Sequence, residues 1–169
     1  EKKAESIYTC MISSEWRVLG CVYRGTDYRN RKVIGEHKQP SLSEEIDKAA
    51  DLMDSDISSM KSSAPVSSST SLLKTFFEFR DFFGERLVYV DKERYPSSVT
   101  ATTDYRFDRK QDAYYKGEEY LTEIYVLSHC NCLLSGRVGI LMAALPMNNL
   151  KYEHKYIYDL GLYTETDYL

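Results

Sequence analysis

A short apolar run at residues 18–23 limits the possible folds more than any other feature of the chain. It has the length of a strand and no charged side chain, which is typical of a strand buried on both faces of a parallel sheet. Arg24, Gly25 and Asp27 follow it at once. A guanidinium at the end of such a strand is well placed to hold an anion, above all a phosphate, at the edge of an α/β sheet. The run therefore predicts an α/β fold with a nucleotide site after its first strand.

A helix with a clear start comes next. Pro40 precedes Ser41 and Glu44, whose spacing is that of a capping box. The following apolar residues recur at three- and four-residue steps, so that one face can lie on a sheet: Ile46, Ala49, Ala50, Met53 and Ile57. A strand followed by an amphipathic helix is a βα unit. We therefore expect strands and helices to alternate along the rest of the chain.

The later segments fit this alternation. Apolar spacing and turn residues predict three helices, at 72–83 with a stop at Gly84, at 117–128, and at 140–145 before Pro146. In the helix at 117–128 the apolar face is expected to hold Tyr120, Leu121, Ile124 and Leu127. Short apolar runs predict three further strands, at 87–90, 132–134 and 155–161.

Two segments have no clear period. Residues 55–71 contain nine serines. This segment is either the strand that the alternation requires or a flexible loop, because Ser and Pro are poor strand formers. Residues 91–116 are polar and rich in Tyr, which predicts a long surface loop of the kind that often covers a site.

Composition narrows the class of protein. The chain has 169 residues, of which 43% are hydrophobic and 28% charged, as expected for one globular domain covering residues 1–169. Its net charge of -4 argues against a nucleic-acid partner, which normally requires a basic surface. No apolar run approaches the roughly 18 residues of a membrane span, and no secretory signal is recognisable. These features predict a cytoplasmic domain with no transmembrane segment.

Cysteine and histidine spacing gives no metal site. The four cysteines match neither a zinc knuckle nor a disulfide framework, and they are expected to be small buried side chains: Cys10, Cys21, Cys130 and Cys132. The three histidines stand singly, without a second ligand at helical or hairpin spacing: His37, His129 and His154.

A second turn repeats the pattern seen after residue 23. Gly136 and Gly139 flank Arg137 and Val138, directly after the expected strand at 132–134. Glycines at this spacing let the backbone approach a diphosphate, and the carboxyl ends of parallel strands meet at one edge of a sheet. The turn is therefore either a second part of the phosphate site or an ordinary βα connection.

Four polar or aromatic residues also have two interpretations. Arg24 binds either an anion or a neighbouring carboxylate such as Asp27. Asp27 is either a general base or the orienting partner of Arg24 or a helix cap, and the supporting role is preferred. Tyr114 and Tyr115 either stack on a base or sugar or form amphipathic surface.

Several segments together resemble the fucosyltransferase-like glycosyltransferases of bacterial capsule, O-antigen and exopolysaccharide synthesis, which are related to the α-1,6- and O-fucosyltransferases. The resemblance rests on residues 18–28, 84–91, 117–121, 124–139 and 147–153. It implies one Rossmann-like half of a GT-B fold, the C-terminal half that binds the nucleotide-sugar donor. Members of the family typically use GDP-fucose and transfer the sugar with inversion, without a cofactor or an obligatory metal.

The resemblance also assigns roles. Arg24 would hold the β-phosphate and stabilise the leaving diphosphate, assisted by Gly25 and Asp27. The turn from Gly136 to Gly139 would offer backbone amides to the same phosphates. The glycan acceptor would bind to an N-terminal domain that is absent from this sequence.

The sequence departs from the family pattern in ways that support a second hypothesis. The acidic element that recognises guanine in relatives is replaced at 67–71 by serines and a threonine, and Ile140 stands where relatives often have Gly or Ser. With the acceptor half also missing, the alternative is a non-catalytic α/β module that serves as a partner-binding or structural unit.

Overall fold

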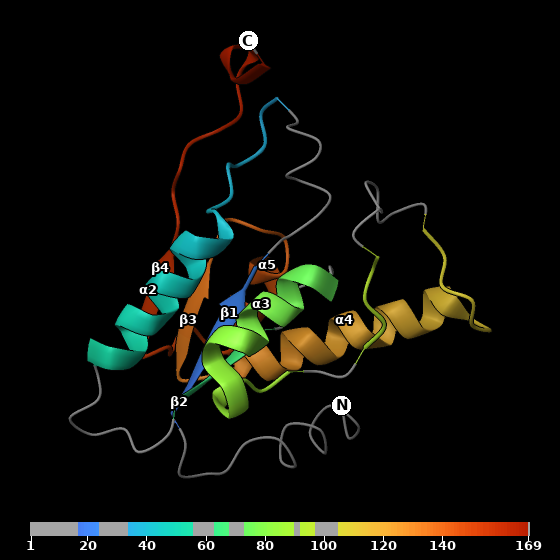
Figure 1. Cartoon of the computed structure of the whole chain (residues 1–169), viewed down its shortest axis with the longest axis horizontal. Coiled ribbons are helices and arrows are strands. Elements are labelled where there is room, and N and C mark those ends of the chain that lie inside the picture. The colour runs from blue at the N-terminus through green and yellow to red at the C-terminus, as the bar shows by residue number, and fades with distance from the viewer. Residues whose placement is uncertain are drawn as a thin grey trace.

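Figure 1 shows a computed structural model of the chain, which describes residues 17–23, 34–55, 63–67, 73–89, 92–96 and 105–168. Within these residues a parallel sheet is covered by helices on both faces. The strands are β1 (Arg17–Val22), β2 (Ser63–Ser67), β3 (Cys132–Ser135) and β4 (His154–Ile157). The α-helices are α2 (Leu42–Ser55), α3 (Leu73–Phe83), α4 (Asp112–Ser128) and α5 (Leu141–Met147). The predicted α/β class with helices on both faces is confirmed.

The strand order is β2-β1-β3-β4, and every neighbouring pair is parallel. β1 and β3 are the central strands of the sheet, and β2 and β4 lie at its two edges. Since β2 comes from the serine-rich segment, residues 63–67 take the strand alternative there, while 56–62 and 68–72 lie outside the described residues. β2 follows β1 in the chain and pairs with one edge of it, and β3 then pairs with the other edge of β1. This order is Rossmann-like.

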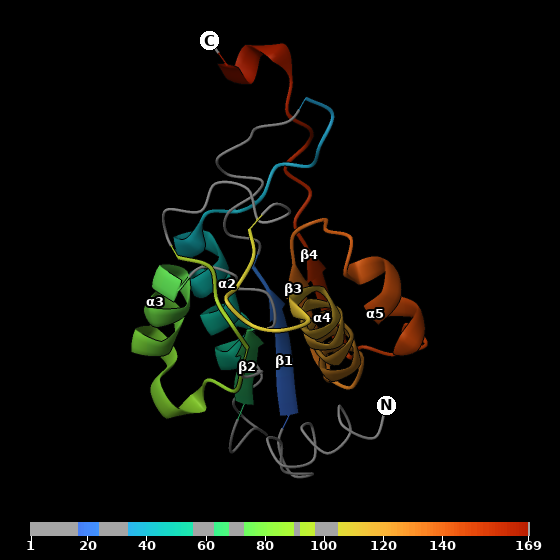
Figure 2. The same cartoon turned by 90° about the vertical axis from the view of Figure 1, so that its right-hand side faces the viewer.

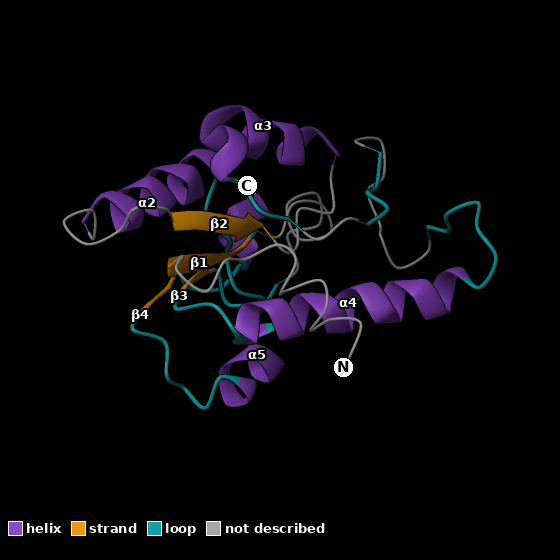
Figure 3. Ribbon diagram, turned by 90° about the horizontal axis from the view of Figure 1, so that it is seen from below, coloured by secondary structure: helices purple, strands orange, loops and turns teal. Residues whose placement is uncertain are grey.

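Alternate residues of the strands build two separate cores. Leu19, Cys21 and Leu134 pack against α2 and α3, whereas Val22 and Leu133 pack against α4 and α5. This division follows from the two-residue period of a strand, because successive side chains point to opposite faces. Figures 2 and 3 show the resulting three layers, with α2 and α3 on one face of the sheet and α4 and α5 on the other.

The start of α2 has the predicted capping box. The Ser41 hydroxyl accepts a hydrogen bond from the Glu44 amide at 3.2 Å, and the Glu44 carboxylate accepts one from the Ser41 amide at 2.6 Å. Of the predicted apolar face, Ala49 and Met53 are buried. The predicted stop of α3 is also confirmed, since Gly84 follows it with a φ of 58°.

The predicted strand at 87–90 is wrong for its described residues, which contain a single β-bridge position, Val88, and no ladder. Leu87 instead packs into the core beside α3. Tyr89 contacts the ring of Phe76 edge-on at a centroid distance of 4.7 Å. Leu87 and Tyr89 thus cover α3, whereas Val88 packs against Val18 and Val126 on the other side of the sheet, so these apolar side chains pack against the core without a ladder.

The predicted boundary between the long loop and the next helix is also wrong. α4 begins at Asp112, five residues before the expected start at Gly117, so only residues 92–96 and 105–111 of the predicted loop are described as irregular. The orientation of the helix differs as well. Tyr120 and Leu121 are exposed, whereas Thr122 and Glu123 are buried with Ile124 and Leu127.

Candidate functional site

The carboxyl ends of β1 and β3 lie side by side, as the alternation of strands and helices predicts. Val22 is paired with Ser135, so Tyr23 and Gly136 continue from neighbouring strand ends. The strand order reverses at this point, because β2 lies on one side of β1 and β3 on the other. In open α/β sheets, ligands bind outside the carboxyl ends of the strands at such a switch point.

The structure places four of the seven predicted site residues. These four connect β3 to α5 at the switch point: Gly136, Arg137, Val138 and Gly139. The other three lie outside the described residues, and their role stays a prediction: Arg24, Gly25 and Asp27.

Gly136 meets the segment that leads into α2. A β-carbon on Gly136 would lie 2.0 Å from Gln39 Oε1 and 3.4 Å from Pro40 Cδ. The Gln39 side-chain amide donates hydrogen bonds to the carbonyl oxygens of His37 at 3.1 Å and Arg137 at 3.3 Å. Gly136 therefore lies in close contact with another segment, and its partner in the structure is the chain's own Gln39 side chain.

A cleft of about 540 Å³ opens beside the same turn. A β-carbon on Gly139 would meet no other atom within 4 Å, so this side of the turn is open. Its lining combines polar residues, Glu36, His37 and Arg137, with apolar residues of α5 and β4: Leu141, Leu145 and Ile157. A cleft that combines a few polar groups with an apolar wall is typical of small-molecule sites.

Arg137 provides positive charge at this cleft. Its guanidinium contacts the Asp159 carboxylate at 2.9 Å, and the two side chains are 47% and 61% exposed. Ion pairs this exposed contribute only about 0–1 kcal/mol to stability. An anionic ligand can therefore compete with Asp159 for this guanidinium at little cost.

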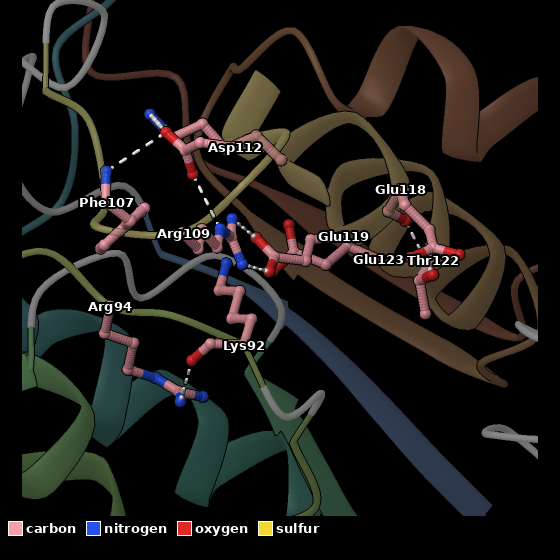
Figure 4. A network of polar contacts seen from close by, with 10 residues as sticks. Lys92, Arg94, Phe107, Arg109, Asp112, Glu118, Glu119, Thr122 and Glu123 are labelled. Atoms are coloured by element: carbon pink, nitrogen blue, oxygen red, sulfur yellow. Dashed lines mark hydrogen bonds and ion pairs between the residues drawn. The ribbon is translucent and has the colours of Figure 1, made fainter. Parts of the chain in front are cut away.

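A second polar cluster organises the start of α4 (Figure 4). Arg109 donates to both carboxylate oxygens of Glu119, at 2.6 and 3.2 Å, and to Asp112 at 2.8 Å. Lys116 pairs with Asp112 at 3.0 Å. Burial acts to raise the pKa of Asp112, but the hydrogen bonds from Arg109 and Lys116 outweigh it and hold that pKa at about 2. This cluster fixes residues 105–111 on the helix.

Lys92 and Glu123 form a buried ion pair next to this cluster (Figure 4). Burial raises the pKa of Glu123, and the contact with Lys92 opposes that shift. A cavity of about 370 Å³ adjoins the pair and is lined by two cations and two carboxylates: Lys92, Arg109, Glu93 and Glu119. Because these charges balance, and both cations already have a carboxylate partner, Glu119 for Arg109 and Glu123 for Lys92, the cluster is best explained as a structural link between 92–96 and α4.

Sequence reasoning missed both polar clusters. The i,i+3 and i,i+4 spacing of Arg109, Asp112 and Lys116 is a local signal that could have predicted the early start of α4. The pair of Lys92 with Glu123 joins residues far apart in sequence, and no spacing rule predicts it. Tyr114 and Tyr115 lie in the first turns of α4, 64% and 40% exposed, with their rings in edge contact at 5.5 Å.

The described cysteines behave as predicted. Cys21, Cys130 and Cys132 are free and buried, while Cys10 lies outside the described residues. Burial raises the pKa of the Cys21 and Cys130 thiols, which keeps them protonated and unreactive. Across the part of the chain that the structure describes, no group of three or more His, Cys, Asp or Glu side chains could hold a metal ion.

The order of the parallel strands, with a cleft beside the turn that follows β3, defines a Rossmann-like α/β domain. Comparison of the sequence with protein-family models gave no match, and neither did comparison with curated proteins. Among the described helices, none combines the length and the apolar character needed to cross a membrane.

Proposed function

We propose that this chain is the donor-binding domain of an inverting, metal-independent glycosyltransferase. The donor is a nucleoside-diphosphate sugar, GDP-fucose according to the sequence resemblance, and the acceptor is a glycan held by another domain. One observation carries the proposal. The end of β1, which precedes Arg24, and the turn from Gly136 to Gly139 meet at the switch point of a parallel sheet, beside an open cleft.

The proposed chemistry places these residues around the leaving group. An acceptor hydroxyl, whose proton passes to a general base on the acceptor side of the site, attacks the anomeric carbon as the bond from that carbon to the β-phosphate oxygen breaks. The break leaves negative charge on the diphosphate. In the proposal, Arg24 and the backbone amides of the Gly136–Gly139 turn stabilise that charge. Loss of one preorganised donor of this kind typically costs about 3 to 4 kcal/mol of transition-state stabilisation.

Arg137 gives the proposed site a second cation. Its pairing with the exposed Asp159 supports a role in which the guanidinium exchanges this carboxylate for a phosphate of the donor. Gly139 supports the same role, because the open space beside it leaves room for a phosphate next to the backbone.

Ligand-induced thermal stabilisation tests the proposal. GDP, UDP, ADP and TDP are added in turn to the wild type and to Arg24→Ala, Arg137→Ala and Arg80→Ala. Arg80 lies on α3, on the opposite face of the sheet, and serves as the matched control. We expect GDP to stabilise the wild type and Arg80→Ala, by about 2.7 kcal/mol at a hundred times the dissociation constant. Arg24→Ala should abolish the effect and Arg137→Ala should weaken it. No response to any diphosphate would count against the proposal.

The contact of Gln39 with Gly136 favours the second candidate, a non-catalytic α/β module. Gln39 occupies the space directly beside Gly136 and donates to the Arg137 carbonyl oxygen, so part of the phosphate turn is already covered. Gln39→Ala separates the two candidates. In a donor-binding domain this variant retains or strengthens GDP binding, because it uncovers the turn. In a non-catalytic module neither the wild type nor Gln39→Ala binds a nucleotide.

A further inference from the structure

The segment that follows β4, residues 158–168, lies against residues 35–38, of which the first three line one wall of the cleft. Both segments extend beyond the carboxyl edge of the sheet, where they run beside each other in Figures 1 and 2. We call residues 158–168 the strap. The strap and residues 35–38 are in contact although they are more than a hundred residues apart in sequence.

Backbone hydrogen bonds join the strap to this wall. The Gly35 amide donates to the Tyr163 carbonyl oxygen, the Tyr163 amide to that of Glu36, and the Lys38 amide to that of Gly161, each at 2.9 Å. His37 and Leu162 form an antiparallel bridge between them. Residues 35–38 therefore obtain three of their backbone hydrogen bonds from the strap.

The strap also contacts the turn after β3, which lines the cleft as well. The Tyr158 amide donates to the Ser135 carbonyl oxygen at 2.8 Å, at the end of β3. Asp159 pairs with Arg137 in the turn that follows. The Tyr158 hydroxyl donates to the Glu44 carbonyl oxygen at 2.8 Å, which ties the same residue to α2. The strap thus contacts two of the segments that line the cleft.

One ion pair lies near the far end of the strap. Lys38 Nζ contacts Asp167 Oδ1 at 2.7 Å, with side chains 33% and 21% exposed. The Asp167 carboxylate also accepts hydrogen bonds from the amide and the hydroxyl of Thr164, at 2.7 and 3.0 Å. Salt screens partly exposed pairs of this kind, so the pair is a point at which ionic strength acts on the strap.

We propose that the strap separates from residues 35–38 in one cooperative local opening, while the sheet stays folded, and that this opening loosens the wall of the cleft. The strap is held closed by the three ladder hydrogen bonds and by the pair of Lys38 with Asp167. Opening removes one side of the cleft while β1, β3 and β4 stay paired. The inference does not depend on which ligand the cleft binds.

Hydrogen exchange of backbone amides tests the proposal at low and high salt. The strap amides are those of Gly35, Lys38 and Tyr163. The reference amides are those of Asn131 and Glu153, which bond to Val18 and Asn131 near the other edge of the sheet. Two variants are compared with the wild type. Asp167→Asn removes the charge and keeps an oxygen that accepts from Thr164, and Asp51→Asn on the exposed side of α2 is the matched control.

We expect the three strap amides to exchange together, at least about tenfold faster than the reference amides, since local opening costs less than global unfolding. Their exchange should accelerate with salt in the wild type and in Asp51→Asn. In Asp167→Asn the strap amides should exchange fast already at low salt, and added salt should change their exchange little. Equal exchange of strap and reference amides, in any variant, would overturn the proposal. So would strap amides that exchange at unrelated rates, or that do not respond to the loss of the Asp167 charge.

Discussion

Gly20 of β1 lies directly against Leu127 of α4. A β-carbon on Gly20 would come within 2.9 Å of Leu127 Cδ2 and 3.2 Å of Cys130 Sγ, and both side chains are buried. This contact sets how closely α4 approaches the central strand of the sheet. Since β1 ends shortly before Arg24 in the chain and pairs with β3 beside the Gly136–Gly139 turn, the same contact helps to position the proposed site.

Gly20→Ala is expected to destabilise the protein by about 1–3 kcal/mol, because an added methyl group overpacks a closed core. Gly117→Ala is the matched control. Gly117 lies within α4 and an added β-carbon would meet nothing within 4 Å. This variant should stabilise the protein by about 0.5–1 kcal/mol, through helix propensity. Urea unfolding measures both, and a Gly20→Ala variant as stable as the wild type would contradict the packing described.

Gly136→Ala should displace Gln39 and break the two hydrogen bonds of its side-chain amide, at a cost of about 1 kcal/mol each or less. In the double variant with Gln39→Ala the methyl group has room, so its cost should largely disappear. A double-mutant cycle from denaturant unfolding measures this coupling. Additive effects of the two substitutions would show that the residues are not in contact.

Leu150 has a left-handed backbone, with a φ of 59°, next to Asn149 at 55°. The Lys151 amide donates to the Asn148 carbonyl oxygen at 3.2 Å, which closes a turn around these two residues. A left-handed conformation costs a residue with a β-carbon roughly 1–2 kcal/mol, and the Leu150 side chain is 65% exposed. Leu150→Gly should therefore raise the free energy of unfolding by up to about 1 kcal/mol. A loss of stability would mean that the side chain contributes more than its exposure indicates.

The carboxyl group of Asp112 should make the free energy of unfolding fall as the pH is lowered from about 4 to about 2. Its pKa is held at about 2 in the folded protein, whereas an unfolded aspartate titrates near 4. Between these values the unfolded chain binds more protons, so the stabilisation by Asp112 is complete above about pH 4 and is lost as the pH falls toward 2. Asp112→Asn should reduce the slope of unfolding free energy against pH in this window by up to about one proton. An unchanged slope would contradict the ion pairs with Arg109 and Lys116.

Local signals in the sequence predicted the parts of the fold that depend on neighbouring residues. The capping box of Ser41 and Glu44 predicted the start of α2, and Gly84 predicted the end of α3, because caps act over a few residues. β2 was predicted only as one of two alternatives. Its serines and proline favour no strand, and its pairing with β1 at the edge of the sheet determines its structure.

The errors have a tertiary cause. Residues 87–90 have the composition of a strand, but Leu87 and Tyr89 use their apolar surface to cover α3. In α4 the apolar pattern predicted that Leu121 would be buried, whereas Glu123 is buried because Lys92 neutralises it from a distant segment. At the candidate site, the sequence predicted the neighbouring strand ends. The contact of Gln39 with Gly136 depends on the three-dimensional path of the segment before α2.

The most direct test of the account locates GDP on the sheet. In an NMR titration with GDP, the amide signals of Gly136, Val138 and Gly139 should shift together and saturate, those of Gly117 and Glu153 should stay in place, and Arg24→Ala should remove the shifts. Saturable shifts confined to another part of the chain, or no saturable shift at these three amides, would contradict the donor site at the ends of β1 and β3.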